Sequence, residues 1–352
     1  MRAIYFTKFG GELSVIEVPA PIAKPNGVVI EVKATGLCRS DWHAWMGHDS
    51  DVKLPHVPGH ELAGVISSIG SGVKNFSVGD RVTVPFVNGC GQCQFCLQGD
   101  AQVCPNQTQP GFTQWGSYAE FVAIENADFN LIRLPEMISF STAAALGCRF
   151  ATAFRGLTAR AKVQNGEWVA IFGCGGVGLS SIMIAKALGA RVIAVDISSV
   201  ALKKALETGA DLALDSNSED VVARIQEITG GGADVGVDAL GSQVTSSQSI
   251  LSLKRLGRHL QLGLLLTPDG LTPEPMGRVI AYELDLLGSH GMAAVDYPKM
   301  MAMVESDKLH PDLLVGHTVG LKEGASRLVE LGRESGFGVG VGGVTIIVPT
   351  QG

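Results

Sequence analysis

Residues 168–198 read WVAIFGCGGVGLSSIMIAKALGARVIAVDIS, and this stretch decides the fold of the central part of the chain. The apolar run 168–172 predicts a buried strand, residues 178–190 predict a helix, and 191–196 predict the next strand. The glycine-rich turn GCGGVG at 173–178 joins the first strand to the helix. A GxGxxG pattern is meaningful in this context, so the stretch predicts a dinucleotide-binding unit.

Each glycine of this turn has its own expected role. Gly173 permits the sharp turn, Gly175 lets a pyrophosphate approach the backbone, and Gly178 lets helix and strand pack closely. The free N–H groups at the helix start, those of Gly176 and Val177 among them, then face the phosphates.

Asp196 ends the second strand at about the expected distance from the glycines. A carboxylate there can accept hydrogen bonds from the adenosine ribose hydroxyls and repels a 2′-phosphate, which favours NAD over NADP. The alternative is that Asp196 only caps the following helix.

Strands and helices alternate from about residue 141 to residue 289. A helix over 246–257 and a strand over 258–264 belong to this series. Strict alternation predicts a parallel sheet with helices on both faces. Up to about residue 140 the chain instead reads as short strands and loops with little helical periodicity, and VTIIV at 344–348 predicts a final strand.

Composition excludes several classes of function. The net charge of −7 provides no basic surface for nucleic acid. No apolar run approaches the roughly 20 residues that a membrane span needs, and the N-terminus lacks the apolar core of a signal peptide. A cytoplasmic protein that binds neither nucleic acid nor membrane is expected.

Four of the seven cysteines crowd into residues 89–105, GCGQCQFCLQGDAQVCP. Their spacing is C-x2-C-x2-C-x7-C, through Cys90, Cys93, Cys96 and Cys104. Four thiolates can close around one tetrahedral zinc ion without an open position, so this site predicts a structural metal. Free thiols or disulfides are the alternative.

Cys38, His60 and Cys148 remain in the segments GLCRSDWHAWMG, VPGHELAG and LGCRF. Together they would form a Cys2His site with three protein ligands and a fourth position open to substrate. Zinc there would let a bound alcohol ionise near neutral pH. Taken singly, each cysteine would more often be buried filler.

The chain resembles the medium-chain zinc-dependent alcohol dehydrogenases over nearly its full length. The matching motifs are CRSDWH at 38–43, GHE at 59–61, the four-cysteine segment, GC at 147–148 and GCGGVG at 173–178. The resemblance implies an α/β protein with a GroES-like β-rich catalytic domain that holds both zinc ions, and a doubly wound Rossmann domain. It implies domain bounds of 1–145 with 290–352, and 146–289, and an active site in the cleft between the domains.

The resemblance also assigns roles to residues near the zinc ligands. Cys38, His60 and Cys148 would bind the catalytic zinc. A proton relay would run from the substrate through Ser40 and a nicotinamide ribose hydroxyl to His43, whose pKa is expected near neutrality. Asp41 would orient a ligand, Glu61 would lie near the metal and ligate it transiently, and Thr152 would pack near the nicotinamide. For Ser40 and His43 the alternative is an ordinary polar residue of a turn, and for Asp41 it is a simple solvated aspartate.

The function expected from these features is reversible oxidation of a primary or aromatic alcohol with NAD, in a homodimer or homotetramer with two zinc ions per chain. Trp42, Trp45, Phe86 and Trp115 fall in segments that border the pocket of relatives, although ordinary core packing explains them as well. A polyol or other secondary-alcohol dehydrogenase is one alternative, which Cys148 disfavours because polyol dehydrogenases of this superfamily tend to use a glutamate there. A non-catalytic binding protein on the same fold is another.

Overall fold

The computed structural model describes residues 1–266, 271–332 and 343–351. The chain divides into two compact units. Unit 1 comprises Met1–Ala151, Gly291–Ser306 and Pro311–Gly352, and unit 2 comprises Thr152–His290 and Asp307–His310. The domain bounds expected from the sequence, 1–145 with 290–352 and 146–289, stay a prediction of which residues form each independently folding domain.

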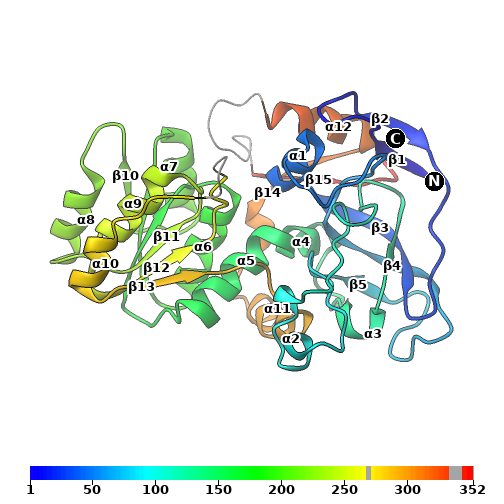
Figure 1. Cartoon of the computed structure of the whole chain (residues 1–352), viewed down its shortest axis with the longest axis horizontal. Helices are drawn as coiled ribbons and strands as arrows, with labels where there is room; N and C mark the ends of the chain where they lie inside the picture. Colours follow the sequence, from blue (N-terminus) through cyan, green and yellow to red (C-terminus); the bar gives the residue numbers. More distant parts are fainter. Residues whose placement is uncertain (267–270, 333–342, 352) are drawn as a thin grey trace. The chain divides into compact units, whose positions relative to one another are not determined.

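Unit 2 is built on a six-stranded parallel sheet with the order β10-β9-β8-β11-β12-β13 (Figure 1). Its strands are β8 (Trp168–Phe172), β9 (Arg191–Asp196), β10 (Leu212–Asp215), β11 (Ala233–Asp238), β12 (Leu253–Gln261) and β13 (Asp285–Gly288). Its helices are α6 (Gly176–Ala187), α7 (Ser199–Glu207), α8 (Val221–Thr229), α9 (Gln243–Leu251) and α10 (Met276–Tyr282). The strand order runs outward from β8 in both directions, and crossovers of the usual right hand then put helices on both faces of the sheet. The expected doubly wound fold is confirmed.

The strand order of unit 2 reverses between β8 and β11, which are hydrogen-bonded neighbours. In open α/β sheets, ligands bind outside the carboxyl ends of the strands at such a switch point. The turn that begins at Gly173 directly follows β8, so the glycine-rich segment lies at this position.

One helix of unit 2 was predicted too long. The predicted helix over 246–257 is wrong in its second half, because α9 ends at Leu251 and β12 begins at Leu253. Leu253 is fully buried and pairs with Ala233 of β11, while Leu256 has a positive φ of 60°. Burial against the neighbouring strand therefore overrides the local helical preference of this segment.

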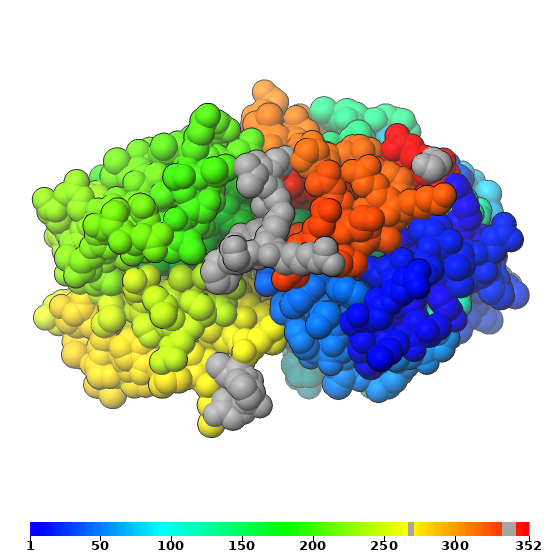
Figure 2. Space-filling model, turned by 90° about the horizontal axis from the view of Figure 1, so that it is seen from above, coloured from blue at the N-terminus to red at the C-terminus, as the bar shows by residue number. Residues whose placement is uncertain are grey.

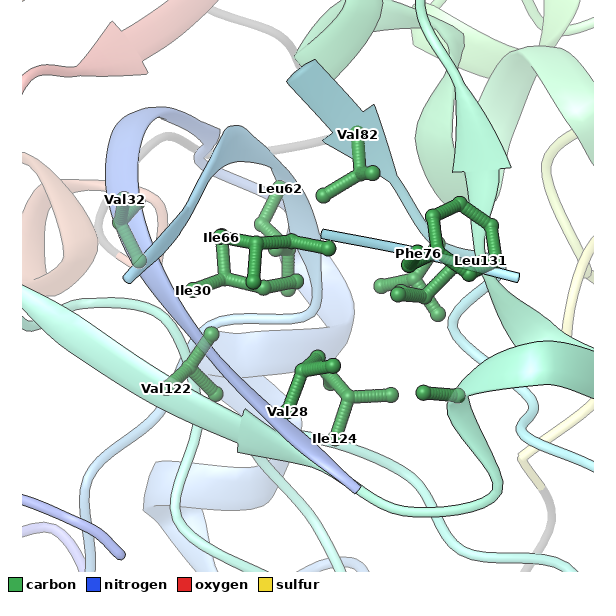
Figure 3. Packing of buried hydrophobic residues seen from close by; sticks show 12 residues of the cluster. Val28, Ile30, Val32, Leu62, Ile66, Phe76, Val82, Val122, Ile124 and Leu131 are labelled. Atoms are coloured by element: carbon green, nitrogen blue, oxygen red, sulfur yellow. The ribbon is translucent and has the colours of Figure 1, made fainter. Parts of the chain in front are cut away.

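Unit 1 contains a seven-stranded sheet with the order β14-β15-β3-β4-β5-β7, and β6 pairs with β3 beside this path. The strands are β3 (Val28–Gly36), β4 (Glu61–Ile69), β5 (Arg81–Thr83), β6 (Phe121–Ile124), β7 (Ile132–Arg133), β14 (Val315–Val319) and β15 (Val344–Ile347). Alternate residues of β3, Val28, Ile30 and Val32, point into one core that also contains Leu62 and Ile124 (Figure 3).

The two ends of the chain meet in unit 1. Strands β1 (Arg2–Tyr5) and β2 (Ser14–Glu17) form a separate antiparallel pair. Helix α12 (Leu321–Glu330) packs Leu321, Ala325 and Leu328 into one cluster with Ile4 of β1, and Figure 2 shows its orange surface beside the blue N-terminal strands. The predicted final strand is β15, which pairs with β3.

The remaining helices of unit 1 are α1 (Arg39–Met46), α2 (Gln94–Leu97), α3 (Ala127–Asn130), α4 (Phe140–Ala145) and α11 (Tyr297–Glu305), and α5 (Ala151–Arg155) leads into unit 2. Helix α1 lies in a region where the sequence predicted strands and loops. Asp41 Oδ2 accepts a hydrogen bond from the backbone N–H of Cys38 at 3.2 Å, and Gly47 ends the helix with a φ of 80°. In the part of the chain that the structure describes, every helix is too short or too polar to cross a membrane.

Candidate active site

Cys38, His60 and Cys148 come together in unit 1, although they lie far apart in the sequence. Together with Glu61 they offer ligand atoms that all lie within 4.8 Å of one another. Cys38 precedes α1, His60 precedes β4, and Cys148 lies in an irregular helical turn at Leu146–Phe150. The sheet and two helix ends thus bring three predicted ligands to one point.

Glycines precede two of these ligands for steric reasons. A Cβ atom on Gly147 would lie 2.7 Å from Glu61 Cβ, and the backbone at Gly147 departs from helical geometry with a ψ of −131°. Gly59 has a φ of +107°, and a Cβ there would lie 2.5 Å from Tyr118. Any other residue at either position would push the following ligand out of place.

The imidazole of His60 has a fixed orientation. Its Nδ1 lies 2.8 Å from Asp41 Oδ1, and both side chains are fully buried. Its Nε2 is buried as well and has no hydrogen-bond partner among the described residues. Because buried polar atoms normally have partners, this nitrogen is an available ligand atom.

Asp41 is held by four donors. Oδ1 faces His60 Nδ1 and accepts from Gly59 N at 3.0 Å, while Oδ2 accepts from Cys38 N at 3.2 Å and from Tyr118 Oη at 2.7 Å. Such outer partners fix the ring of a metal-binding histidine and raise its basicity. Asp41 therefore lies where the sequence analysis expects an orienting residue.

The two sulfur atoms of this site are electrostatically linked. A hydrogen bond from Cys148, the Arg149 charge and His60 together lower the pKa of Cys38 well below its ordinary value. The same hydrogen bond and burial raise the pKa of Cys148. One thiolate, a second sulfur beside it and a free imidazole nitrogen form a donor set that zinc prefers, so the residues fit this metal.

Glu61 is paired with a residue that the sequence analysis did not single out. Its carboxylate accepts hydrogen bonds from Arg149 N and Arg149 Nε, both at 3.2 Å, and forms a salt bridge with the guanidinium Nη2. Burial raises the pKa of Glu61, and the Arg149 charge opposes this shift. Transient ligation of metal by Glu61 stays a prediction.

Ser40 and His43 lie on α1, three residues apart and therefore on one face of the helix. Ser40 Oγ is 3.8 Å from Cys38 Sγ, and His43 Nδ1 is 2.9 Å from His48 Nδ1. Burial, the Arg39 charge and His48 lower the pKa of His43 to about 4. This value differs from the near-neutral pKa expected from the sequence, because His43 is partly buried and has cationic neighbours.

The four-cysteine segment forms a second donor set in unit 1, and the four ligand atoms also lie within 4.8 Å of one another. The Sγ–Sγ distances are 4.0 Å for Cys90 and Cys96 and 3.7 Å for Cys93 and Cys104. Sulfur atoms at ~2.3 Å from a tetrahedral zinc are roughly 3.8 Å apart. Backbone N–H groups of Gln92 and Cys93 lower the pKa of Cys90 to about 6, so the segment fits a zinc ion bound by thiolates.

The glycine-rich turn of unit 2 has a separate steric environment at each glycine. Gly173 has a φ of +92°, and a Cβ on Gly178 would lie 1.8 Å from Gly173 O. A Cβ on Gly175 would meet nothing within 4 Å, so the space before the first turn of α6 is open. Gly176 and Val177 form that first turn, where N–H groups lack partners within the helix.

Asp196 reaches back to this turn. Its Oδ2 accepts from Cys174 N at 2.7 Å, and its Oδ1 accepts from Ser198 N at 2.9 Å. The residue that caps α7 is Ser198, whose side chain accepts from Ala201 N, so Asp196 is not the cap. Thr152 is buried in α5, and its expected place near a nicotinamide stays a prediction.

Comparison with known proteins identifies the family. Residues 24–136 match the family model of the alcohol dehydrogenase GroES-like domain, and residues 176–306 match that of the zinc-binding dehydrogenases. An alcohol dehydrogenase of Geobacillus stearothermophilus is 35% identical over 82% of this chain and 84% of its own length. The chain belongs to the medium-chain zinc-dependent alcohol dehydrogenases.

Two further relatives show the breadth of this family. A sorbitol dehydrogenase of Halalkalibacterium halodurans is 33% identical over 92% of this chain and 94% of its own length. The crystal structure of an NAD-dependent alcohol dehydrogenase is similar with a TM-score of 0.87, at 31% identity and over 99% of each chain. The chain is thus an oxidoreductase of the alcohol dehydrogenase type, and zinc is the metal that its two donor sets suit.

The aromatic residues of this dehydrogenase divide into two groups. Phe86 and Phe112 lie edge-on to the His60 ring, with centroid distances of 6.0 Å and 5.2 Å. Trp45 packs in one hydrophobic cluster with Phe112 and Trp115 packs in another, and their indole N–H groups donate to Gly11 O and Pro55 O. Of the four aromatic residues that the sequence suggested for the pocket, Phe86 is the one whose ring packs against a predicted zinc ligand, His60.

Four residues near the site were not predicted from the sequence: Phe112, Tyr118, Arg149 and His48. Of these four, only Arg149 could have been found from the sequence, because it is a charged residue within the small and apolar run STAAALGCRFATAF. Tyr118 and Phe112 gave no such signal, since aromatic residues in β-rich segments usually fill the core. His48 follows a helix that the sequence did not predict.

Proposed function

We propose that this dehydrogenase reversibly oxidises a primary or aromatic alcohol to its aldehyde with NAD, using one catalytic and one structural zinc per chain. One observation carries the proposal: two sulfurs converge in unit 1 with His60 Nε2, which has no hydrogen-bond partner in the described part of the chain. Three protein ligands leave a tetrahedral metal one open position, which distinguishes a catalytic site from a closed structural one.

The residues of the chain have distinct proposed roles. Cys38, His60 and Cys148 would hold the catalytic metal, and Asp41 would fix the His60 ring through its bond to Nδ1. Zinc, when bound, supplies Lewis-acid polarisation of an alcohol or carbonyl oxygen. Ser40, near Cys38, would accept the alcohol proton, and His43 on the same helix face would carry it outward.

The proposed NAD site is the glycine-rich turn of unit 2. The open space at Gly175 and the N-terminus of α6 suit a pyrophosphate, and NAD supplies the hydride acceptor. Asp196, held beside the turn by Cys174 N, would accept hydrogen bonds from ribose hydroxyls and repel a 2′-phosphate.

Replacing Asp196 with glycine tests this cofactor assignment. The KM for NAD should rise about tenfold, which is the loss of roughly 1.4 kcal/mol of binding, and the preference over NADP should relax. Steady-state kinetics with both cofactors measure this effect, with Asp215→Gly, at the end of the neighbouring strand β10, as the matched control. An unchanged cofactor preference contradicts the assignment.

Substrate preference is proposed from the walls around His60. Phe86 and Phe112 present aromatic surface there, which suits a primary or aromatic alcohol better than a bulky branched one. A polyol or other secondary alcohol is the second candidate, and the similarity to a sorbitol dehydrogenase favours it.

Metal analysis followed by a substrate panel tests the whole proposal. Two zinc ions per chain and alcohol-dependent formation of NADH, highest for primary or aromatic alcohols, are expected. Higher kcat/KM for polyols would select the second candidate. Two bound zinc ions without turnover of any alcohol would favour the remaining alternative, a non-catalytic binding protein on the same fold.

A further inference from the structure

His48 contacts His43 through a turn that only a glycine permits. Helix α1 ends at Met46, and Gly47 adopts a φ of +80°, at which a Cβ would lie 2.8 Å from the Phe9 ring. The backbone N–H of His48 donates to His43 O at 3.0 Å, so the chain folds back along the helix. The two Nδ1 atoms then lie 2.9 Å apart, within hydrogen-bond distance.

The pair of rings has a defined shape. Trp42 packs edge-on against both imidazoles, with centroid distances of 4.9 Å to His43 and 5.5 Å to His48. A hydrogen bond between two Nδ1 atoms needs one ring to donate and the other to accept, so the two rings hold different tautomers. The arrangement is therefore directional.

Exposure gives the pair an inner and an outer end. His43 is half-buried, and His48 is exposed. Burial and the positive charges that face His43, those of Arg39 and of His48 when protonated, lower its pKa to about 4, while Cys38 acts in the opposite direction. His43 consequently stays neutral at neutral pH, does not keep a second ring proton, and needs an acceptor for each additional proton that reaches it.

We propose that His48 is the outer member of the proton relay, which accepts at Nδ1 the proton that His43 releases and passes one to solvent. This inference rests on the proposed function, because the proton originates from the alcohol. Nothing in the sequence motifs of the site includes His48, which lies beyond the CRSDWH segment.

The transfer balances as a proton exchange with no redox change. His43 starts neutral with its proton on Nδ1 and takes a second proton at Nε2. Its Nδ1–H bond then breaks as an N–H bond forms at His48 Nδ1, and the Nε2–H proton of His48 leaves to water or buffer. Both rings end neutral with their tautomers exchanged. Aldehyde reduction runs the same path backward and restores them, as does exchange with water.

His48→Gln and His48→Ala test the proposal in the zinc-loaded enzyme. Proton release during alcohol oxidation, followed with a pH-indicator dye in a weakly buffered stopped-flow experiment, should slow about tenfold in both variants. Added imidazole should restore the rate in His48→Ala, and the solvent isotope effect should rise. His317→Gln, an exposed histidine on β14, is the matched control and should behave as the wild type.

The outcomes separate this inference from the proposed function. Unchanged proton release in both His48 variants overturns the role of His48. So does a slower rate with no imidazole rescue and no change in isotope effect, because that result indicates a structural role of the turn. A wild-type enzyme that oxidises no alcohol overturns the proposed function and the relay with it. Zinc content and thermal unfolding of each variant show that its fold is intact.

Discussion

Two metal-binding sites of unit 1 both use cysteine sulfur but are assembled in opposite ways. The four-cysteine segment takes all its donors from residues 90–104, and backbone N–H groups support its sulfurs. The site at Cys38, His60 and Cys148 collects its donors from three distant segments. Charged side chains, Asp41 beside His60 and Arg149 beside Glu61, surround those donors.

The difference shows how a protein separates stability from chemistry. A closed set of four thiolates can only hold a loop together, since no position is left for a substrate. The open set has three ligands, and its buried charges must be paired precisely where they lie, because an unpaired charge in the interior is costly. The two sites should therefore respond differently to the same kind of substitution.

The largest expected effect comes from Cys38→Ser at the open site. Loss of one of three ligands should lower kcat/KM at least roughly a thousandfold, which corresponds to about 4 kcal/mol of transition-state stabilisation. Zinc should fall from two ions per chain to one, and thermal stability should change little. His60→Ala should do the same. Turnover near wild type in a folded variant with one zinc would falsify the catalytic role of this site.

Cys104→Ser, at the four-cysteine site, should affect stability and leave catalysis unchanged. Zinc again falls to one per chain, but here the loss should cost about 3 kcal/mol of stability and lower the Tm by roughly 6–9 °C. The folded fraction should keep its kcat, because a metal closed in by four thiolates has no open position for a substrate. Scanning calorimetry with zinc analysis measures this. Cys174→Ser, outside both sites, should keep both ions and serves as the control.

Thousandfold loss of kcat with an unchanged Tm in Cys104→Ser would contradict the division of roles. That result would mean that the four-cysteine site is itself needed for catalysis.

Asp41→Asn sharpens the comparison at the level of the supporting residues. An amide offers one acceptor oxygen where the carboxylate uses both, so either His60 Nδ1 or the backbone N–H of Cys38 loses its acceptor. Zinc affinity of the open site should fall about 10–100-fold, while the four-cysteine site keeps its affinity. Transfer of zinc to a chelator should become biphasic. Asp51→Asn, an exposed carboxylate, is the control, and a single slow phase in Asp41→Asn would refute the orienting role.

The smallest expected effect concerns acid. Residues 89–105 contain no histidine, whereas α1, which directly follows Cys38, carries His43 with its pKa lowered to about 4. Between pH ~6.5 and 4 the unfolded chain binds a proton at this position and the folded chain does not, so the wild type loses stability as the pH falls. His43→Gln should lose less. The Tm difference between the two proteins, followed against pH, should change across this window and stay constant above it; parallel curves would contradict the shift.

Some features could be predicted because their determinants are local. The turn from Gly173 to Gly178, the strands on either side of α6 and the four-cysteine spacing each lie within one short stretch. Gly189 and Gly209 follow α6 and α7 with positive φ, as expected of residues that end helices. In such segments the sequence pattern and the local backbone geometry have the same cause.

Other features depend on neighbours that are distant in the chain. The segment Leu253–Gly257 joins a strand because β11 lies beside it, against its helical pattern. The helix that presents Ser40 and His43 was missed, and the lowered pKa of His43 depends on burial, on Arg39 and on the returning His48. These properties depend on what surrounds a side chain once the chain has folded.

The sequence by itself determined the kinds of site that this protein can build, because ligand types, glycines and their order are written along the chain. Only the tertiary structure decided which atoms are available in them. It left His60 Nε2 without a hydrogen-bond partner among the residues that the structure describes, engaged Glu61 with Arg149 and turned His48 back onto His43. Burial and hydrogen bonding act through space, so a charge or lone pair acquires its final state only when residues far apart in the sequence become neighbours.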